Sequence, residues 1–263
     1  MHITSRDNAL LRQARLVRDG KIVELIFIEG LRLAEEALRS GLKIEASIYS
    51  DELAKKERAA EVITQLTQVA IRSASVSEKL LESISYTKTP QGIVVLAQRP
   101  ESAAARFKNP DAKSLIVVMH QINNPVNVGA ILRTAEAAGV SGVIATKHTS
   151  DPYSPKSLRG AMGSAFRLPI WMEAEYEQVV GWCKKHKIKT VCTDASASSS
   201  YTDVDWTSSI ALILGPESTG LSYKETSITT QTVRIPMHGA VESLNVSVAA
   251  GILLFEAARQ RSL

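Results

Sequence analysis

The polar residues with the greatest potential for chemistry stand just before a long apolar helix near the end of the chain. Glu242, Ser243 and Asn245 occupy the turn that leads into this helix, which is predicted to run from about Ser243 to the C-terminus. A side-chain oxygen at a helix start caps the free N–H groups, and Ser243 suffices for that. Asn245 is then a second polar side chain in the first turn. Because a helix N-terminus also attracts anionic groups, we expect capping and ligand binding together here.

A second candidate is the glycine turn "GPESTGLS" at residues 215–222, which contains Glu217 and follows a buried strand. Its two glycines have the spacing of a phosphate-binding P-loop, but Leu221 stands where the P-loop needs lysine. No GxGxxG follows a strand, which argues against a standard dinucleotide site. The turn therefore either lets backbone groups approach a ligand closely or serves only as a turn.

A third candidate is Asn127, placed before a predicted helix, with Arg133 six residues later near its middle. Taken alone, Asn127 is interpreted as a helix cap and Arg133 as an exposed or paired surface residue. They become candidates for chemistry only together with the other two turns.

The elements that must position these residues form an α/β pattern. Apolar strands are predicted at 114–122, 140–146, 189–196 and 209–218, with a short extended segment at 232–237. Helices are predicted between them at 127–139, 154–166 and 176–187. Continuous apolar strands that alternate with helices indicate a parallel sheet covered on both faces, and such sheets bind ligands at the carboxyl ends of their strands. In the last helix we expect Leu244, Val248, Ile252 and Phe255 to form the core face.

The first part of the chain is a second, smaller α/β block. Strands are predicted at 23–30, 44–50, 69–75 and 91–98, and helices at 31–41 and 51–66, the latter opened by an Asp cap. No cluster of His, Cys or paired carboxylates suggests chemistry here. A segment with two prolines and mixed charge follows, so we predict domains at 1–100 and 113–263 joined by a linker at 101–112.

Composition limits the compartment and the partners. The 263 residues are 44% hydrophobic and 22% charged, with a net charge of +4 and a pI near 9.0, which suits a nucleic-acid partner without requiring one. Two cysteines without CxxC spacing exclude a disulfide framework. The N-terminus lacks a signal peptide, and the longest nearly apolar run, 246–255, is too short to cross a bilayer. We therefore expect a soluble, cytoplasmic protein with no membrane partner.

Three stretches carry a family resemblance: "NNPVNVGAILRTAEAAGV", "LILGPESTGL" and "RIPMHGAVESLNVSVAAGILLFEAARQ". In this order they resemble the three signature motifs of the SpoU (TrmH-type) RNA 2′-O-ribose methyltransferases of the SPOUT superfamily. The opening "ITSRDNALLRQARLVRDGK" and "FIEGLRLAEEAL" are similar, more loosely, to the L30e-like substrate-binding domain that precedes the catalytic domain in many members.

The resemblance implies a trefoil-knotted C-terminal domain in which the loops at Gly215 and Ile235 pass through one another, a topology that connection rules disfavour. It also implies a homodimer with an active site across the interface. The implied pocket for S-adenosylmethionine (AdoMet) is formed by Thr193, Leu214, Gly215, Ile235, Met237 and Leu244. The implied catalytic set is Arg133, Asn127, Glu217, Ser243 and Asn245, and no metal is expected.

The implied reaction is attack of a ribose 2′-hydroxyl on the methyl group of AdoMet, with loss of the hydroxyl proton. The residue matching Arg133 is the family's proposed base, yet a free guanidinium keeps its proton up to a pH of about 12. Arg133 therefore either accepts the proton or orients phosphate and steadies charge while another group accepts it. Ribosomal RNA is favoured as the partner over tRNA because of the L30e-like extension. A non-catalytic RNA-binding or ribosome-assembly factor of the same fold is the alternative from another class.

Overall fold

The computed structural model describes residues 1–108, 110 and 113–262, and its chain divides into two compact units. Unit 1 contains Met1–Glu101 together with Tyr153–Arg167, and unit 2 contains Ser102–Pro152 and Leu168–Leu263. The segment 153–167 lies within the predicted second domain, yet it clusters with unit 1. Its place in the fold follows from tertiary contacts.

Part of the predicted linker at 101–112 is packed. Residues 109, 111 and 112 lie outside the described residues, but Ala103–Lys108 form a 3-10 helix, η1. Phe107 in η1 is buried, and its ring lies 5.9 Å from the rings of both Trp171 and Trp182. Trp182 also donates its indole N–H to the Phe107 carbonyl at 3.0 Å. This aromatic cluster ties η1 to unit 2.

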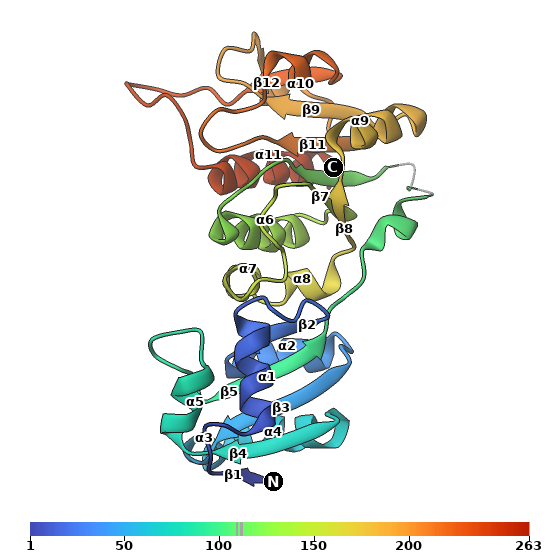
Figure 1. Cartoon of the computed structure of the whole chain (residues 1–263). Helices are drawn as coiled ribbons and strands as arrows, with labels where there is room; N and C mark the ends of the chain where they lie inside the picture. The colour runs from blue at the N-terminus through green and yellow to red at the C-terminus, as the bar shows by residue number, and fades with distance from the viewer. Residues whose placement is uncertain (109, 111–112, 263) are drawn as a thin grey trace. The chain divides into compact units, whose positions relative to one another are not determined.

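Unit 1 is built on a mixed five-stranded sheet with the order β1-β4-β3-β5-β2 (Figure 1). β1 and β3 run parallel to β4, whereas β5 runs antiparallel to β3 and β2. The strands are β1 His2–Ile3, β2 Leu25–Glu29, β3 Ile44–Ser50, β4 Arg72–Val76 and β5 Ile93–Gln98. All four strands that the sequence predicts for this block are therefore present, within a few residues at their ends.

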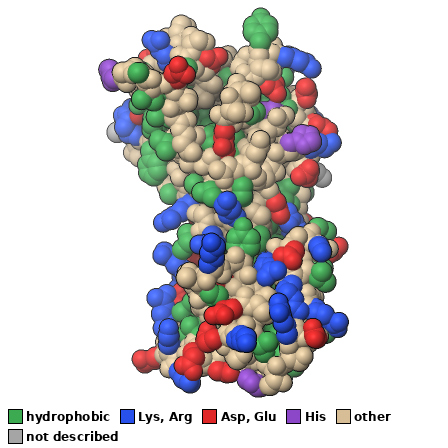
Figure 2. All heavy atoms as spheres, turned by 60° about the vertical axis from the view of Figure 1, so that its left-hand side comes forward, with side chains coloured by type: hydrophobic (Ala, Val, Ile, Leu, Met, Phe, Trp, Pro, Cys, Tyr) green, Lys and Arg blue, Asp and Glu red, His purple; other side chains and the backbone are tan. Residues whose placement is uncertain are grey.

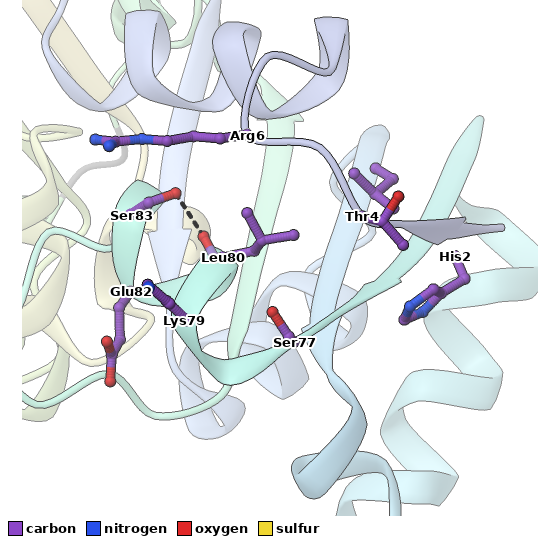
Figure 3. Close-up of a pocket in the computed structure, with 9 residues that line it drawn as sticks. His2, Thr4, Arg6, Ser77, Lys79, Leu80, Glu82 and Ser83 are labelled. Atoms are coloured by element: carbon purple, nitrogen blue, oxygen red, sulfur yellow. Dashed lines mark hydrogen bonds between the residues drawn. The ribbon is translucent and has the colours of Figure 1, made fainter.

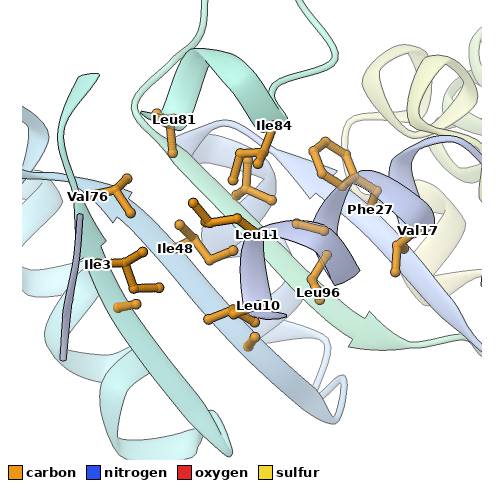
Figure 4. Packing of buried hydrophobic residues seen from close by; sticks show 14 residues of the cluster. Ile3, Leu10, Leu11, Val17, Phe27, Ile48, Val76, Leu81, Ile84 and Leu96 are labelled. Carbon is orange, nitrogen blue, oxygen red and sulfur yellow. The ribbon is translucent and has the colours of Figure 1, made fainter. Parts of the chain in front are cut away.

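Helix α1, Ala9–Arg18, covers one face of this sheet, although no element is predicted for these residues. Asn8 caps it by accepting the Leu10 N–H at 2.9 Å. Its buried residues recur at helical spacing and join the core of unit 1 (Figure 4): Leu10, Leu11, Ala14 and Val17. The Asn8 cap and the helical spacing of the apolar residues are both present in the sequence, so α1 could have been predicted from local signals.

The remaining helices of unit 1 are α2 Leu31–Arg39, α3 Asp51–Ala54, α4 Glu57–Val69, α5 Glu78–Ile84, α7 Pro155–Ala161 and α8 Ser164–Arg167. The single helix predicted at 51–66 is wrong, because the chain breaks at Lys55 and Lys56 into α3 and α4. Ser50, and not an aspartate, caps α3 by accepting the Leu53 N–H at 3.2 Å.

Unit 2 contains a seven-stranded sheet in which every pair is parallel, with the order β10-β12-β9-β11-β6-β7-β8. β6, β7 and β11 are buried along their whole length, which confirms the predicted parallel sheet covered on both faces. The strands are β6 Leu115–Met119, β7 Gly142–Thr146, β8 Ile170–Ala174, β9 Lys189–Thr193, β10 Ser199–Ser200, β11 Ile210–Leu214 and β12 Gln231–Arg234.

Helices pack on both faces of this sheet. Successive strand residues point to opposite faces, so Ile116 and Val118 of β6 pack in one cluster with α9, Tyr176–Lys185. α6, Pro125–Ala137, and α11, Val246–Arg261, pack against each other, and Figure 1 shows them side by side, away from α9. The short helix α10, Tyr223–Ser227, and the 3-10 helix η2, Tyr201–Asp203, complete the unit.

The predicted core face of the last helix is wrong. α11 begins at Val246, so Leu244 precedes it, and the side chains of Val248 and Phe255 are 51% and 55% exposed. The buried residues are Ala250, Leu253, Leu254 and Ala257. Because α11 is apolar on nearly all sides, hydrophobic spacing cannot select its buried face, and contact with α6 selects it instead.

Candidate functional site

A pocket of about 600 Å³ lies at the carboxyl ends of three neighbouring strands of unit 2. Thr193 ends β9, Leu214 ends β11 and Arg234 ends β12. Three segments far apart in the sequence therefore meet here, as the rule for parallel sheets predicts. The pocket is lined by all six residues predicted to bind the cofactor, Thr193, Leu214, Gly215, Ile235, Met237 and Leu244, and by three from the predicted catalytic set, Glu217, Ser243 and Asn245.

Gly215 begins the wall formed by loop 215–222. A Cβ at this position would stand 2.9 Å from Leu221 Cγ and 3.0 Å from the Leu221 nitrogen. Real Cβ atoms are essentially never found that close, so a larger residue would force the loop open. The glycine therefore allows the far end of the loop to fold back on its beginning, and in doing so it shapes the pocket.

The structure at the start of α11 shows which polar residue caps the helix. Asn245 is the N-cap, and its Oδ1 accepts from the Ser247 N–H at 2.9 Å and from the Ser247 hydroxyl at 2.6 Å. Ser243 precedes the cap, is exposed and lines the pocket. The predicted assignment of the cap to Ser243 is therefore wrong, because the helix begins later than the apolar pattern suggests.

Asn245 also reaches the first motif. Its Nδ2 donates to Asn127 Oδ1 at 3.2 Å. The Ser247 N–H fixes the orientation of the Asn245 amide, and this in turn places the oxygen of Asn127 toward Asn245. Asn127 Nδ2 is buried and has no hydrogen-bond partner among the described residues. A buried donor without a partner is costly, although Asn127 itself is not among the residues that line the pocket.

Asn127 itself does not cap α6. Asn124 is the N-cap and accepts from the Val126 N–H at 3.0 Å, whereas Asn127 lies within the first turn and is 5% exposed. The predicted capping role of Asn127 is therefore wrong. Asn127 is buried instead, in hydrogen-bond contact with Asn245, which lines the pocket.

Arg133 lies apart from this group. It is exposed on α6, and within the described ranges it is not part of the pocket wall. Six residues of helix separate it from Asn127, which turns its side chain well away from that of Asn127. In one copy of the chain, the structure does not bring Arg133 to the other predicted residues.

Three further charged residues line the wall: Glu242, which the sequence already offered as a candidate, and Asp194 and Arg234, which are additions. Asp194 and Arg234 stand at strand ends, where the parallel-sheet rule already pointed. Hydrogen bonds from the hydroxyl and the backbone N–H of Ser196 hold the pKa of Asp194 below its ordinary value. With Glu217 the wall carries three carboxylates and one guanidinium, a balance that favours a ligand with positive charge.

Unit 1 has a groove of its own, of about 630 Å³, between the start of the chain and helix α5 (Figure 3). Arg6, Lys79 and Glu82 are the charged residues that line it. Unit 1 holds 18 Lys and Arg against 14 Asp and Glu, which accounts for the whole net charge of the chain. In the face that Figure 2 shows, most Lys and Arg side chains lie on this unit.

The described residues offer neither a metal site nor a membrane-spanning helix. They contain no group of three or more His, Cys, Asp or Glu side chains able to hold a metal ion. None of the helices in the described part of the chain is long and apolar enough to cross a membrane.

The parallel sheet with a pocket at its strand ends defines an α/β protein with a ligand site at the carboxyl edge. Residues 114–255 match the SpoU rRNA Methylase family, and residues 13–95 match the MRM3-like substrate binding domain. The chain belongs to the SpoU rRNA Methylase family, which confirms the resemblance drawn from its three motifs.

The similarity to known proteins extends over nearly the whole chain. The 23S rRNA (guanosine(2553)-2′-O)-methyltransferase RlmP of Bacillus subtilis is 30% identical, over 87% of this chain and 86% of its own length. The 23S rRNA (uridine(2479)-2′-O)-methyltransferase of Streptomyces viridochromogenes is 30% identical, over 89% and 82%. The AdoMet-bound rRNA methyltransferase from Sinorhizobium meliloti superposes with a TM-score of 0.86 at 30% identity, over 98% of this chain and 97% of that one.

Proposed function

We propose that this protein transfers a methyl group from AdoMet to a ribose 2′-hydroxyl of 23S ribosomal RNA. The observation that carries the proposal is the pocket at the ends of β9, β11 and β12, which gathers nine of the eleven predicted site residues. The two curated relatives, matched over more than four fifths of their length, act on 23S rRNA, and the Sinorhizobium relative binds AdoMet. Acting on ribosomal RNA, the protein would work in the cytoplasm.

The residues present fit AdoMet. A volume of about 600 Å³ lies in the usual range for a small-molecule site. Main-chain groups at Leu214, Gly215 and Ile235 would bind the adenine, and the side chains of Met237 and Leu244 offer apolar contact. The carboxylates of the wall suit the positive sulfonium.

AdoMet supplies an electrophilic methyl group, and the chain must position and deprotonate the hydroxyl. Asn245 lines the pocket, and the side chain of Asn127, whose buried amide N–H has no partner among the described residues, accepts a hydrogen bond from it. Ser243 and Glu217 offer a hydroxyl and a carboxylate on the same wall. In our proposal these groups orient the ribose and cofactor. Arg133 either accepts the hydroxyl proton or steadies the developing charge while another group accepts that proton.

We further propose a homodimer in which Arg133 reaches the pocket of the partner copy. Arg133 lies on α6, which packs on α11. These two helices expose apolar side chains, with Val126 at 45%, Val248 at 51% and Phe255 at 55%. A second copy that covers this face would bury them and bring Arg133 near a pocket.

The experiment is methyl transfer from radiolabelled AdoMet to separately purified 23S rRNA, 16S rRNA and tRNA. We expect the label in 23S rRNA. The methylated nucleotide should be detected by its resistance to alkaline cleavage, which a ribose methyl group blocks. The two curated relatives methylate a guanosine and a uridine at equal identity, so the nucleotide must be mapped directly. Label in tRNA alone would favour the tRNA alternative, and RNA binding without transfer would favour a non-catalytic factor.

A further inference from the structure

Loop 215–222 forms a large part of the AdoMet pocket, and both of its ends are held by one buried histidine. His120 directly follows β6 and is 3% exposed. Its backbone N–H donates to the Leu214 carbonyl at 2.9 Å. This bond anchors the residue that immediately precedes the loop.

The side chain of His120 anchors the other end. Its Nε2 lies 2.9 Å from Glu225 Oε1, and the other carboxylate oxygen of Glu225 accepts from the Ser222 N–H at 2.6 Å and the Ser222 hydroxyl at 2.7 Å. Ser222 is the last residue of the loop. Glu225 therefore transmits the position of His120 to the point where the loop enters α10.

The imidazole is itself held in place. Its Nδ1 lies 3.0 Å from Thr146 Oγ1 at the end of β7, and its ring centre lies 4.4 Å from that of Tyr176. Because an ionised carboxylate only accepts hydrogen bonds, Nε2 carries the proton shared with Glu225. The Tyr176 hydroxyl donates to the Glu225 carbonyl at 3.1 Å, which fixes α10 from the α9 side.

We propose that His120 is a positioning residue for the AdoMet pocket, holding loop 215–222 closed through Leu214 at one end and through Glu225 and Ser222 at the other. The proposal rests on the proposed function for the identity of the ligand. It assigns His120 no contact with substrate. Its role is to keep the loop in the shape that binds AdoMet, which lowers the ordering cost of binding.

The test uses full-length protein and two substitutions. His120→Phe keeps a ring of similar size and the backbone bond to Leu214 but removes both side-chain hydrogen bonds. His120→Gln keeps an N–H able to reach toward Glu225. We expect His120→Phe to raise the Kd and KM for AdoMet about tenfold, with kcat at saturating AdoMet changed less than about threefold. His120→Gln should recover most of the affinity.

His186→Phe is the matched control, because His186 directly follows α9 in the same unit, has its ring centre 5.3 Å from that of Trp182, and does not line the pocket. It should leave AdoMet affinity unchanged. A double variant of His120→Phe with Glu225→Gln should bind AdoMet with about the same affinity as the single variant that binds AdoMet more weakly. The reason is that the two changes break one shared contact. Wild-type affinity in His120→Phe, or an equal fall in the two histidine variants, would overturn the proposal.

Hydrogen exchange without AdoMet separates this proposal from the proposed function. His120→Phe should speed amide exchange in residues 215–225 while the strands of unit 1 keep their protection. If wild-type protein failed to bind AdoMet but the loop still loosened, the proposed function would fail and the positioning role would stand. Unchanged exchange in the loop would refute the positioning role even in an active enzyme.

Discussion

At the scale of single residues, the candidate site depends on a few side chains that do two things at once. Asn245 caps α11 through its oxygen and meets Asn127 through its nitrogen. His120 joins the end of β6 to both ends of loop 215–222. Substitutions at such residues change stability and activity together, so a useful variant must separate the two.

Asn245→Ser should make this separation. Serine keeps a cap oxygen for α11, whereas alanine loses the cap at a cost of about 0.5–2 kcal/mol. Both variants lose the amide that contacts Asn127, and we expect both to slow single-turnover methyl transfer by about a hundredfold or more. Thermal melting should fall clearly for Asn245→Ala only. A normal rate in Asn245→Ser would leave Asn245 with capping as its whole role.

Arg133→Ala should abolish methyl transfer while AdoMet affinity and melting temperature stay near wild type, because the side chain is exposed. Arg259→Ala is the control, an exposed arginine on α11 that pairs with Glu256 at 2.8 Å. If Arg133 serves the partner's pocket, mixing Arg133→Ala with Asn245→Ala subunits should restore about a quarter of wild-type activity through mixed dimers. Near-normal turnover of Arg133→Ala alone would show the assignment to be wrong.

The pH dependence of stability should report on Glu225. Burial raises the pKa of its carboxyl, but hydrogen bonds from Ser222 and His120 outweigh burial and hold the pKa below the ordinary value of 4.5. The stabilisation by ionised Glu225 is therefore complete above about pH 4.5 and is lost as the pH falls through the lower folded-state pKa. The melting temperature of wild type minus that of Glu225→Gln should be largest near neutral pH and shrink below pH 4.5. A difference that grows on acidification would contradict this.

At the scale of elements, α6 and α11 matter most for the proposed function, because they carry the exposed apolar surface proposed as the dimer contact. α11 is apolar almost all round, buries one side against the fold and exposes Val248 and Phe255 on another. Exposed apolar side chains that recur along one face of a helix indicate a contact surface. The packing of α11 therefore supports the proposed dimer and also explains why the predicted core face was wrong.

Phe255→Glu tests this surface. A carboxylate there would be desolvated in the dimer at high cost, so we expect a monomer by light scattering, with methylation reduced at least about tenfold and AdoMet still bound. Val69→Glu is the control, because Val69 on α4 is 56% exposed, close to the 55% of Phe255. A dimer that persists in Phe255→Glu would place the interface elsewhere.

At the scale of the whole molecule, the net positive charge and the candidate site lie in different units. Unit 1 carries the net positive charge, and unit 2 carries the pocket. Positive charge gives RNA affinity that weakens with salt. This division supports a substrate-binding role for the first unit, in line with its match to the MRM3-like substrate binding domain.

Removal of residues 1–100 should therefore leave AdoMet binding in place but lower kcat/KM for 23S rRNA at least about tenfold, chiefly through KM. The melting temperature should also fall, because α7 packs on β2 and its Leu158 and Ala161, 1% and 0% exposed, would lose cover. AdoMet titration and RNA kinetics on the same preparation check both points. Full activity of the truncated chain on 23S rRNA would refute the substrate-binding role.

Local sequence signals determined much of this protein. Runs such as Leu115–Met119 and Ile210–Leu214 are apolar throughout, which predicts buried parallel strands, and that prediction is confirmed. Since the carboxyl ends of parallel strands share one edge, the polar turns after them were the place to seek a site. The three motifs then indicated the family, because their residues and their order along the chain match the signature motifs of that family.

Other features were decided only by tertiary structure. The buried face of α11 depends on where α6 lies, since the apolar residues of α11 point in nearly every direction. Segment 153–167 joins unit 1 through contacts with β2, far away in the sequence. His120 appeared in the sequence as part of a strand, and only the fold brings it to Glu225, 105 residues later. Local patterns record the preferences of neighbouring residues, whereas these contacts depend on which distant surfaces the folded chain brings together.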